Sequence, residues 1–485
     1  AQAGSEGCAA SQAHFSARAR RRGDTAVCSH GQHLKVLNDL PLPESVQGMQ
    51  LSVVVQLTAL LQRWRHLRPR VLLALAGIWL WHYLLNVQRV QVHLGRGGNP
   101  GSEKSLRAAH KRMKRIVGKC PSLAAMYWPT FCAHTPPLQF LLLALKEFRT
   151  RVFERNPYYR EVLTLRDGSH IALDWVDPVV QKREEDAKQH ADGRDELPVC
   201  VLLHGAIQDS RSVTMTDLSR SLARRGMPAV VMNRRGYGGL DLGTGELRLT
   251  MFGFDDDLDD VIINSVSKRY PGRSVALVGF SCGSSFSMRY AGSRSQELSA
   301  WERVTAAARG RKATLLCAVA YDPGYDVSPD GAVTKIGWPY NWALNWAIKY
   351  CYAWRHRGQL CKKSESTEQL VQRIMSPRRG LQQTYKEARR LAGAGDSSAW
   401  LDTQQPTLDT CTVPTIMINS RDDPICVWDN VKAFYADFSA NPNMALVELQ
   451  RGAHGCKFGF WGGVSVIDSM IGEFVQSCWR ELREQ

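Results

Sequence analysis

A glycine-flanked serine directly after an apolar run is the feature of this sequence that most restricts its fold. Residues 274–280 have the composition of a buried strand, and residues 281–290 read as a helix that follows at once. The segment Gly279–Gly283 is therefore Gly-x-Ser-x-Gly in a strand–turn–helix context. Side chains two positions either side of the serine would collide with the adjoining strand and helix, so this sharp turn requires both glycines. The turn presents the Ser281 hydroxyl as a candidate nucleophile.

Two polar loops downstream carry the partners that such a hydroxyl needs. A serine hydroxyl is a weak nucleophile until a base takes its proton and a carboxylate orients that base. The strand predicted over residues 413–419 precedes an Asp-Asp pair, and the strand predicted over residues 445–449 precedes His454. The chain order serine, aspartate, histidine predicts a catalytic triad of Ser281, Asp423 and His454.

The acid of this triad stays open between two neighbours at this point. Asp423 is preferred to Asp422 because it directly precedes Pro424 and Ile425. Acyl transfer also needs backbone N–H donors for the oxyanion. We expect these donors at Cys282, which follows the nucleophile, and at Ala206 or a neighbouring residue. No metal or cofactor is required by this chemistry.

The loop that contains Ala206 has a second interpretation. His204 is expected to be structural, although His204 and Asp209 also fit a short His-x-x-x-x-Asp pattern associated with acyltransferases. The pattern overlaps the expected oxyanion loop, which favours the first interpretation. Cys282 is discounted as a nucleophile because of its place in the turn.

Alternating strand and helix patterns from about Asn156 onward predict an α/β-hydrolase fold, with a mostly parallel sheet and helices on both faces. The expected catalytic domain is 157–485, with a helical cap at approximately 327–405. A hairpin is predicted at Asp167-Gly168. The aromatic-rich stretch 338–346 is expected either to shield an acyl chain or to pack as a surface helix.

The N-terminal third is expected to attach the protein to a membrane. Residues 1–67 are basic and show no clear periodicity, and the chain begins with Ala1 rather than Met, as in a fragment or a processed form. Residues 71–87 contain no formal charge. A spanning helix needs about 20 apolar residues, so 68–90 is predicted to be a transmembrane anchor, with an interfacial or a buried core helix as the alternatives. Residues 91–156 read as a helical juxtamembrane segment.

Charge and cysteine content exclude several other classes of protein. The net charge is +16, and its basic clusters flank the apolar stretch, where they suit anionic headgroups. The sequence has no zinc-finger spacing, aromatic RNA-binding signature or basic zipper, so nucleic acid is not an expected partner. The thirteen cysteines never form Cys-x-x-Cys, so neither a zinc site nor a disulfide framework is indicated.

Several motifs between about Leu106 and Gly463 resemble the YheT-like α/β-hydrolases, a group that includes eukaryotic membrane-anchored phospholipases and monoacylglycerol lipases. The resemblance rests on these segments: Cys120-Pro121 through Pro129-Thr130, Leu138-Gln139, Tyr159-Arg160-Glu161, Asp167-Gly168, Asp174-Trp175, Asn233 to Gly236, Gly279 to Gly283, Asn419 to Pro424 and Gly452 to Gly455. It implies nucleophile Ser281, acid Asp423 and base His454. The sequence departs from the family in Cys282, where Leu is usual, and in Ala453, where Gly is usual.

The resemblance implies a membrane-associated serine hydrolase that cleaves carboxylic esters, often of glycerolipids or phospholipids. An endomembrane location through a single N-terminal anchor is expected. The alternatives are an inactive scaffold with a hydrolase fold, and an acyltransferase or thioesterase that uses the same triad. The oligomeric state has no signature in the sequence.

Overall fold

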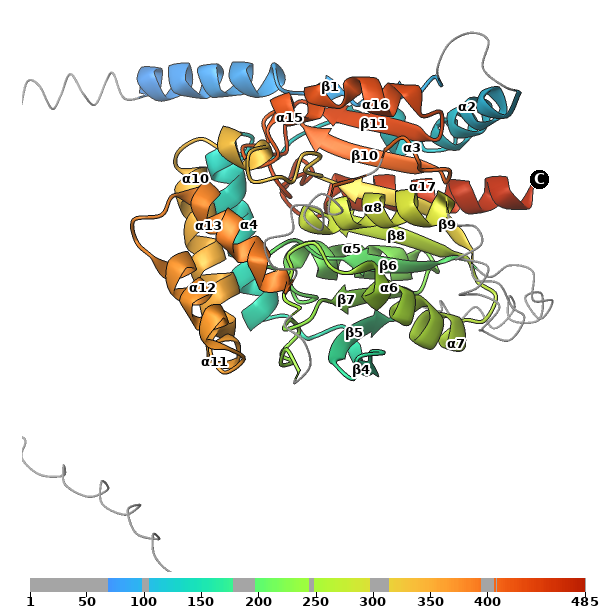
Figure 1. Ribbon diagram of the computed structural model, residues 1–485. Helices are drawn as coiled ribbons and strands as arrows, with labels where there is room; N and C mark the ends of the chain where they lie inside the picture. The colour runs from blue at the N-terminus through green and yellow to red at the C-terminus, as the bar shows by residue number, and fades with distance from the viewer. Residues whose placement is uncertain are drawn as a thin grey trace, which may run out of the picture. The chain divides into compact units, whose positions relative to one another are not determined.

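The computed structural model describes residues 69–97, 104–177, 197–243, 248–296, 314–393, 405–406 and 408–484. The chain divides into two compact units, Ala1–Ile78 and Trp79–Gln485. The second unit is built on a nine-stranded sheet (Figure 1). From edge to edge its strands are β2 (Gln91–Leu94), β11 (Met444–Leu449), β10 (Thr415–Ser420), β9 (Leu315–Tyr321), β8 (Val275–Phe280), β6 (Val199–Leu203), β7 (Ala229–Asn233), β5 (His170–Val176) and β4 (Tyr159–Thr164).

The six strands from β11 to β7 are parallel, and β2, β5 and β4 are added antiparallel at the edges. Every residue of β6, β7, β8 and β10 is buried, as expected for parallel strands covered on both faces. Strands β4 and β5 pair antiparallel around Gly168, whose φ is 79°. The hairpin predicted at Asp167-Gly168 is confirmed.

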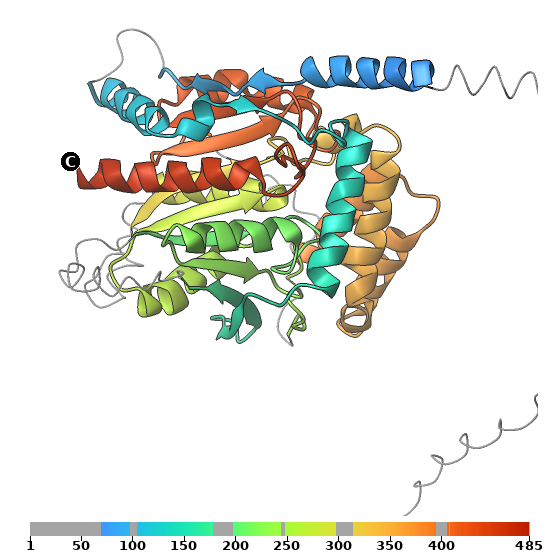
Figure 2. The ribbon, with the colours of Figure 1, turned by 180° about the vertical axis from the view of Figure 1, so that it is seen from behind.

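Helices cover both faces of the sheet. One face is covered by α2 (Lys104–Gly118), α5 (Val213–Arg224) and α17 (Val466–Arg483), as Figure 2 shows. The other face is covered by α6 (Asp255–Val261), η2 (Ile262–Val266), α7 (Ser267–Arg269), α8 (Cys282–Gln296), α15 (Trp428–Ala433) and α16 (Tyr435–Ala440). This is the α/β-hydrolase architecture that the alternation of strands and helices predicted.

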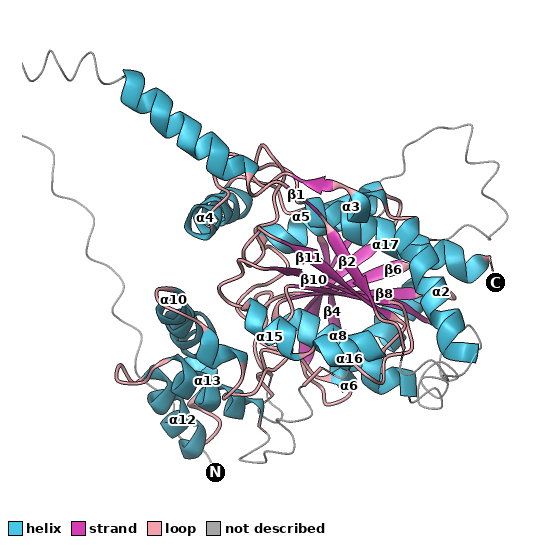
Figure 3. Cartoon of the chain, turned by 90° about the horizontal axis from the view of Figure 1, so that it is seen from above, coloured by secondary structure: helices cyan, strands magenta, loops and turns pink. Residues whose placement is uncertain are grey.

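A group of helices lies beyond the carboxyl ends of the parallel strands, at the opposite side of the unit from the end of α17 (Figures 1 and 3). They are η3 (Ala332–Lys335), α10 (Tyr340–Ala347), η4 (Ile348–Trp354), α11 (Arg355–Leu360), α12 (Glu365–Met375), α13 (Leu381–Arg389) and η5 (Arg390–Ala392). All fall within the range expected for the cap. They share an apolar core that includes Tyr352 and Tyr385.

The aromatic-rich stretch is divided between the surface and the cap core, against which Tyr340 packs. Trp338, Trp342 and Trp346 are exposed at the surface of the cap, while the cap core is formed by residues such as Ile348 and Tyr352 on the opposite side of the same helical segment.

The segment 68–90, predicted to be an anchor, forms a helix with a largely exposed apolar surface, followed by a strand. A helix covers residues 69–84 and is followed by strand β1 (Gln88–Arg89), which pairs with β3 (Met126–Tyr127). Within the described ranges, no helix is both long and apolar enough to cross a bilayer. The end of the segment contacts the catalytic unit: Tyr83 is buried and its hydroxyl donates to the Pro129 carbonyl at 2.9 Å.

Residues 91–156 are not a purely helical juxtamembrane segment. They contribute the edge strand β2, which pairs with β11, followed by α2, α3 (Pro121–Ala124), β3 and α4 (Pro136–Val152). The polar and apolar residues of Gln91–Leu94 alternate over only four positions, too few for a clear strand signal. The compact catalytic unit therefore begins well before residue 157.

Candidate active site

Ser281 occupies the turn between β8 and α8. Its φ is 54°, in the left-handed region that residues with a Cβ rarely adopt. A Cβ on Gly279 would lie 2.1 Å from the Gly283 carbonyl oxygen, and a Cβ on Gly283 would lie 2.1 Å from the Leu203 carbonyl oxygen. Both glycines are therefore needed for the strands and α8 to approach each other, and the turn between them projects the serine hydroxyl.

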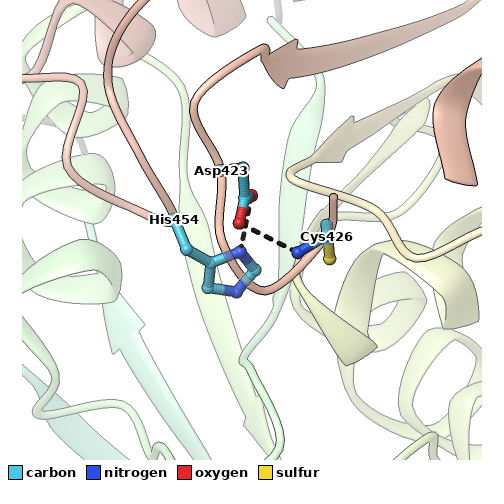
Figure 4. Close-up of side chains that lie close together, drawn as sticks. All are labelled: Asp423, Cys426 and His454. Atoms are coloured by element: carbon cyan, nitrogen blue, oxygen red, sulfur yellow. Dashed lines mark hydrogen bonds and ion pairs between the residues drawn. The ribbon is translucent and has the colours of Figure 1, made fainter. Parts of the chain in front are cut away.

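The loops after β10 and β11 bring the two other predicted residues to this hydroxyl. His454 Nε2 lies 2.9 Å from Ser281 Oγ, and His454 Nδ1 lies 2.9 Å from Asp423 Oδ2. With the proton on Nδ1, the ring donates to the carboxylate and accepts from the hydroxyl. The second carboxylate oxygen accepts the backbone N–H groups of Ile425 and Cys426 at 2.8 and 2.9 Å, which fixes its orientation (Figure 4).

The electrostatics of this pair favour a charged carboxylate beside a basic imidazole. Burial lowers the pKa of His454, but the charge of Asp423 and its hydrogen bond outweigh burial and leave the pKa above its ordinary value. Burial raises the pKa of Asp423, and the charge of His454 with its hydrogen bond reverses this, so the pKa lies below its ordinary value. The imidazole is thus the stronger base that proton abstraction from a hydroxyl requires.

Asp422 and Asp423 have different surroundings, so the structure separates the two candidates for the acid. Asp422 Oδ1 accepts the backbone N–H of Ala453 at 2.9 Å, while Asp423 contacts the His454 ring. Burial raises the pKa of Asp422 to about 6. The Asp422 side chain therefore supports the histidine loop through the backbone N–H of Ala453, whereas the ring is held by Asp423.

Both expected oxyanion donors lie beside the serine. Cys282 begins α8, and the amide of Ala206 lies close enough to the Cys282 thiol to lower its pKa. Burial is the larger effect and raises that pKa to about 11, so the thiol stays protonated at neutral pH and is a poor nucleophile. The structure thus brings the amide of Ala206 next to Cys282, the residue that follows the nucleophile.

Arg234 is a site residue that sequence reasoning did not identify. Its buried guanidinium donates to the carbonyl oxygens of His204 and Gly205 at 2.5 and 2.6 Å, directly before Ala206. Burial and the charge of Arg234 hold the pKa of His204 well below its ordinary value, so this histidine is neutral and structural. The Arg-Arg pair after β7 was the available signal in the sequence.

The His204–Asp209 pattern is not assembled as a reactive pair. The carboxylate of Asp209 faces Arg151, with Oδ1 3.0 Å from the guanidinium, and His204 is fully enclosed against Arg234. The hydrogen-bond partner of the Ser281 hydroxyl is His454.

A second set of side chains around the histidine has the composition of a metal site. Ligand atoms of Asp423, Cys426 and His454 lie within 4.8 Å of one another (Figure 4). Burial raises the pKa of the Cys426 thiol well above its ordinary value, and the thiol donates to the Asp322 carbonyl at 3.3 Å. A thiol must ionise to bind a metal, and both carboxylate oxygens of Asp423 already accept N–H donors. The cluster therefore fits an acid–base pair better than a metal site.

The chain matches one family model and is similar to several solved structures. Residues 195–457 match the family model described as serine aminopeptidase, S33 (Hydrolase_4). Similar solved structures include an esterase of Pyrococcus furiosus (16% identity, 66% of this chain, 90% of that chain, TM-score 0.38) and the esterase Est1E of Butyrivibrio proteoclasticus with ferulic acid bound (14%, 66%, 99%, 0.40). A 2,6-dihydroxy-pseudo-oxynicotine hydrolase is also similar (13%, 78%, 80%, 0.40).

Proposed function

This chain belongs to the serine aminopeptidase S33 family of α/β-hydrolases, whose model matches more than half of its length, and we propose that it hydrolyses carboxylic esters of glycerolipids or phospholipids through an acyl-enzyme on Ser281. The chain is an esterase-like serine hydrolase. The observation that carries the proposal is the position of His454, 2.9 Å from both the Ser281 hydroxyl and the Asp423 carboxylate.

The proposed cycle has two acyl transfers. His454 Nε2 takes the Ser281 proton while Oγ attacks the ester carbonyl, and the amides near Ala206 and Cys282 stabilise the oxyanion. The tetrahedral intermediate collapses, the ester C–O bond breaks, and the leaving alcohol takes the proton from His454. Water, deprotonated by His454, then attacks the acyl-enzyme and releases the acid and Ser281.

The lipid substrate is supported by the surroundings of the nucleophile. Ala206 and Cys282 pack against the apolar core of the cap, which includes Tyr237, Phe252 and Tyr352. An apolar wall beside the serine suits an acyl chain better than a polar substrate. The motifs shared with the YheT-like group, which remain a resemblance, point the same way.

A membrane location, at an endomembrane, is part of the same proposal. It is supported by the basic clusters of the N-terminal region and by the resemblance to membrane-associated hydrolases. Carbonate extraction of cell membranes tests how the protein is attached, and release from untreated membranes in buffer alone would contradict a membrane location.

Fluorophosphonate labelling and product analysis test the proposed nucleophile against two other functions of this site, an inactive scaffold and an acyltransferase or thioesterase. An inactive scaffold would not react with a fluorophosphonate, and an acyltransferase or thioesterase would pass the acyl group to an added alcohol or prefer a thioester. We expect the wild type to label with a fluorophosphonate and to release fatty acid from glycerolipids. The variant Ser281→Ala should label no more than background and lose roughly four to six orders of magnitude in kcat.

Substrate profiling should compare glycerolipids, a short soluble ester, a thioester and an aminoacyl anilide. The last probe is included because the family description names an aminopeptidase. Labelling that persists in Ser281→Ala, or an absence of labelling in the wild type, would contradict the proposed nucleophile. Hydrolysis of the anilide in preference to every ester would replace the proposed substrate class.

A further inference from the structure

Five aromatic side chains of the cap form one exposed row. Trp338, Trp342, Trp346, Tyr350 and Trp354 follow one another at intervals of four residues and are 82%, 65%, 50%, 43% and 45% exposed. The rings of Trp346 and Tyr350, two neighbours in the row, lie 5.1 Å apart. We call these five residues the aromatic row. Large aromatic groups are rarely left exposed together on a monomeric protein without a partner.

Trp338 lies in the turn before α10, and the helix that follows has the geometry needed to keep the other four residues of the row on one face. An α-helix has 3.6 residues per turn, so side chains at every fourth position drift slowly around its axis. The chain is α-helical from Tyr340 to Ala347 and continues as the wider π-helix η4, whose i→i+5 hydrogen bonds turn the row back. The opposite side of the segment is buried, with Ile348 and Tyr352 in the cap core.

The charge around the aromatic row is positive. From Pro339 to Lys363 the chain contains no Asp or Glu, and four of its cations are Arg355, Arg357, Lys362 and Lys363. The fifth, Lys349, is buried and donates to the Ser376 carbonyl at 2.7 Å. Arg355 and Arg357 are exposed, and the Arg357 guanidinium lies 3.2 Å from the centre of the Trp354 ring. The surface therefore combines aromatic rings, which concentrate at membrane interfaces, with cations that complement anionic headgroups.

Helix α4 adds a second apolar row beside the first. Leu141, Leu145, Phe148 and Val152 on this helix are exposed. The rings of Phe140 and Tyr340 lie 5.4 Å apart, which joins the start of α4 to the start of α10. Both helices lie at the same end of the unit (Figures 1 and 2).

This surface adjoins the active site. Phe140 packs against Ala453 and Cys456, on either side of His454, and Tyr340 packs against the same apolar core as Ala206 and Cys282. A lipid that leaves a bilayer along α4 and α10 would therefore reach the nucleophile without crossing the rest of the protein.

We propose that the aromatic row and the exposed row of α4 form the surface on which the enzyme rests against an anionic lipid bilayer. This proposal rests on the proposed lipid hydrolysis and names the surface that collects its substrate. A protein partner would need acidic residues at the particular positions that face these cations. A lipid bilayer with anionic headgroups supplies negative charge along the whole row, so the bilayer is the occupant that we propose.

The test uses the full chain and vesicles of phosphatidylcholine with or without phosphatidylserine. The variant Trp342→Ser/Trp346→Ser should weaken binding to anionic vesicles by about tenfold or more, because two large apolar groups no longer leave water. Its hydrolysis of a soluble short-chain ester should equal that of the wild type. The matched control Val162→Ser/Leu482→Ser removes exposed apolar side chains on β4 and α17, far from the cap, and should bind like the wild type.

A charge variant separates the contribution of the cations from that of the aromatic rings. Arg355→Gln/Arg357→Gln should weaken binding to vesicles with phosphatidylserine by several-fold, and this difference should shrink as salt is added. Vesicle binding by Trp342→Ser/Trp346→Ser that equals binding by the wild type would place lipid contact elsewhere in the chain and overturn the proposal. So would a wild-type dimer in solution that this variant dissociates while its vesicle binding is unchanged.

The two proposals fail in different ways. If the wild type hydrolyses neither soluble nor vesicle-borne esters but its vesicle binding depends on the aromatic row, the surface stands and the catalytic proposal is wrong. If soluble esters are hydrolysed and vesicle binding is unaffected by the aromatic variant, the catalytic proposal stands and the surface is wrong.

Discussion

Lys457 and Asp322, both fully buried, form an ion pair beneath the loop that carries His454. Lys457 Nζ also donates to the Ala453 carbonyl at 3.0 Å, and the Asp322 carboxylate accepts the backbone N–H of Gly455 at 2.7 Å. The residues on both sides of the histidine are thus bound to one buried pair. Asp322 directly follows β9, so the pair fixes the loop to the sheet. It therefore positions His454 without contacting a substrate.

Removal of the lysine should be costly because it leaves the carboxylate buried without its partner. We expect Lys457→Met to lower the free energy of unfolding by about 3–5 kcal/mol, measured by urea denaturation. In the folded fraction, kcat should fall more than KM rises, since the substrate contacts are intact but the base is displaced.

A matched control is the exposed pair formed by Lys432 and Asp429, whose charged atoms are 3.0 Å apart. Lys432→Met should leave both stability and kcat unchanged, because exposed ion pairs contribute little. Equal stability of the two methionine variants would show that the buried pair does not hold the loop.

The two neighbouring aspartates should respond differently to the same substitution. Asp423→Asn removes the charge that faces His454 and should lower kcat by about four orders of magnitude. Asp422→Asn keeps an oxygen that can accept the Ala453 N–H, so its loss should stay within about tenfold. Steady-state kinetics on a soluble ester measures both, and a reversed order would reassign the triad acid to Asp422.

The local part of this site was predictable from sequence because its signals are short-range. The turn at Ser281 shows glycines at fixed spacing between a buried strand and a helix, and the late loops show their polar residues directly after apolar strands. Ala453, noted as a departure from a glycine, has a φ of 37°. A left-handed backbone explains why glycine is common there.

The long-range part was not predictable. Lys457 reads as a loop lysine and Asp322 as a turn aspartate, and nothing local reveals that they meet across more than a hundred residues. Arg234 likewise reads as a surface cation, although it is buried against the oxyanion loop. The apolar run that predicted an anchor lies mostly on an exposed helix surface, with Leu73 at 72% exposure, whereas the burial of Tyr83 against Pro129, 46 residues later, has no local signal.

The pH dependence of the reaction should follow His454. Acylation needs the neutral imidazole, and its pKa lies above the ordinary value because Asp423 outweighs burial. We therefore expect kcat/KM to rise with pH through a value above about 6.5 and then level off. Asp423→Asn removes the largest effect that raises the pKa of His454, so the rising limb of its weaker activity should move to lower pH. A limb that moves to higher pH would contradict this assignment of charge.

The same pair should affect stability over a defined range of pH. The pKa of His454 is raised in the folded state, so its contribution is present below about pH 6.5 and is lost as pH rises through the folded pKa. The pKa of Asp423 is lowered, so its contribution is present above about pH 4 and is lost as pH falls through the folded pKa. We expect urea denaturation to show the largest difference in the free energy of unfolding between the wild type and His454→Gln/Asp423→Asn between about pH 4 and pH 6.5. A difference that keeps growing above pH 8 would contradict this prediction.

The glycines of the turn should not tolerate even one methyl group. Gly283→Ala would place a Cβ 2.1 Å from the Leu203 carbonyl oxygen, where only backbone movement can relieve the clash. We expect a loss of more than about 4 kcal/mol, or insoluble protein. Gly118→Ala, at a helical position with no atom within 4 Å of the new Cβ, should be neutral or stabilising by up to about 1 kcal/mol. Thermal unfolding compares the two, and a folded, active Gly283→Ala enzyme would mean that the turn is looser than its geometry indicates.

Arg234 should affect catalysis through the loop that it holds. A lysine cannot bind the His204 and Gly205 carbonyls as a planar guanidinium does, so Arg234→Lys should loosen the amide of Ala206. Because oxyanion contacts form in the transition state, kcat should fall by about 10- to 100-fold while KM changes little. The neighbouring Arg235, paired with Asp257 at 2.7 Å, is the control: Arg235→Lys should lower stability but leave the kcat of the folded enzyme near that of the wild type. If both variants lower stability and neither lowers kcat, Arg234 supports the fold only.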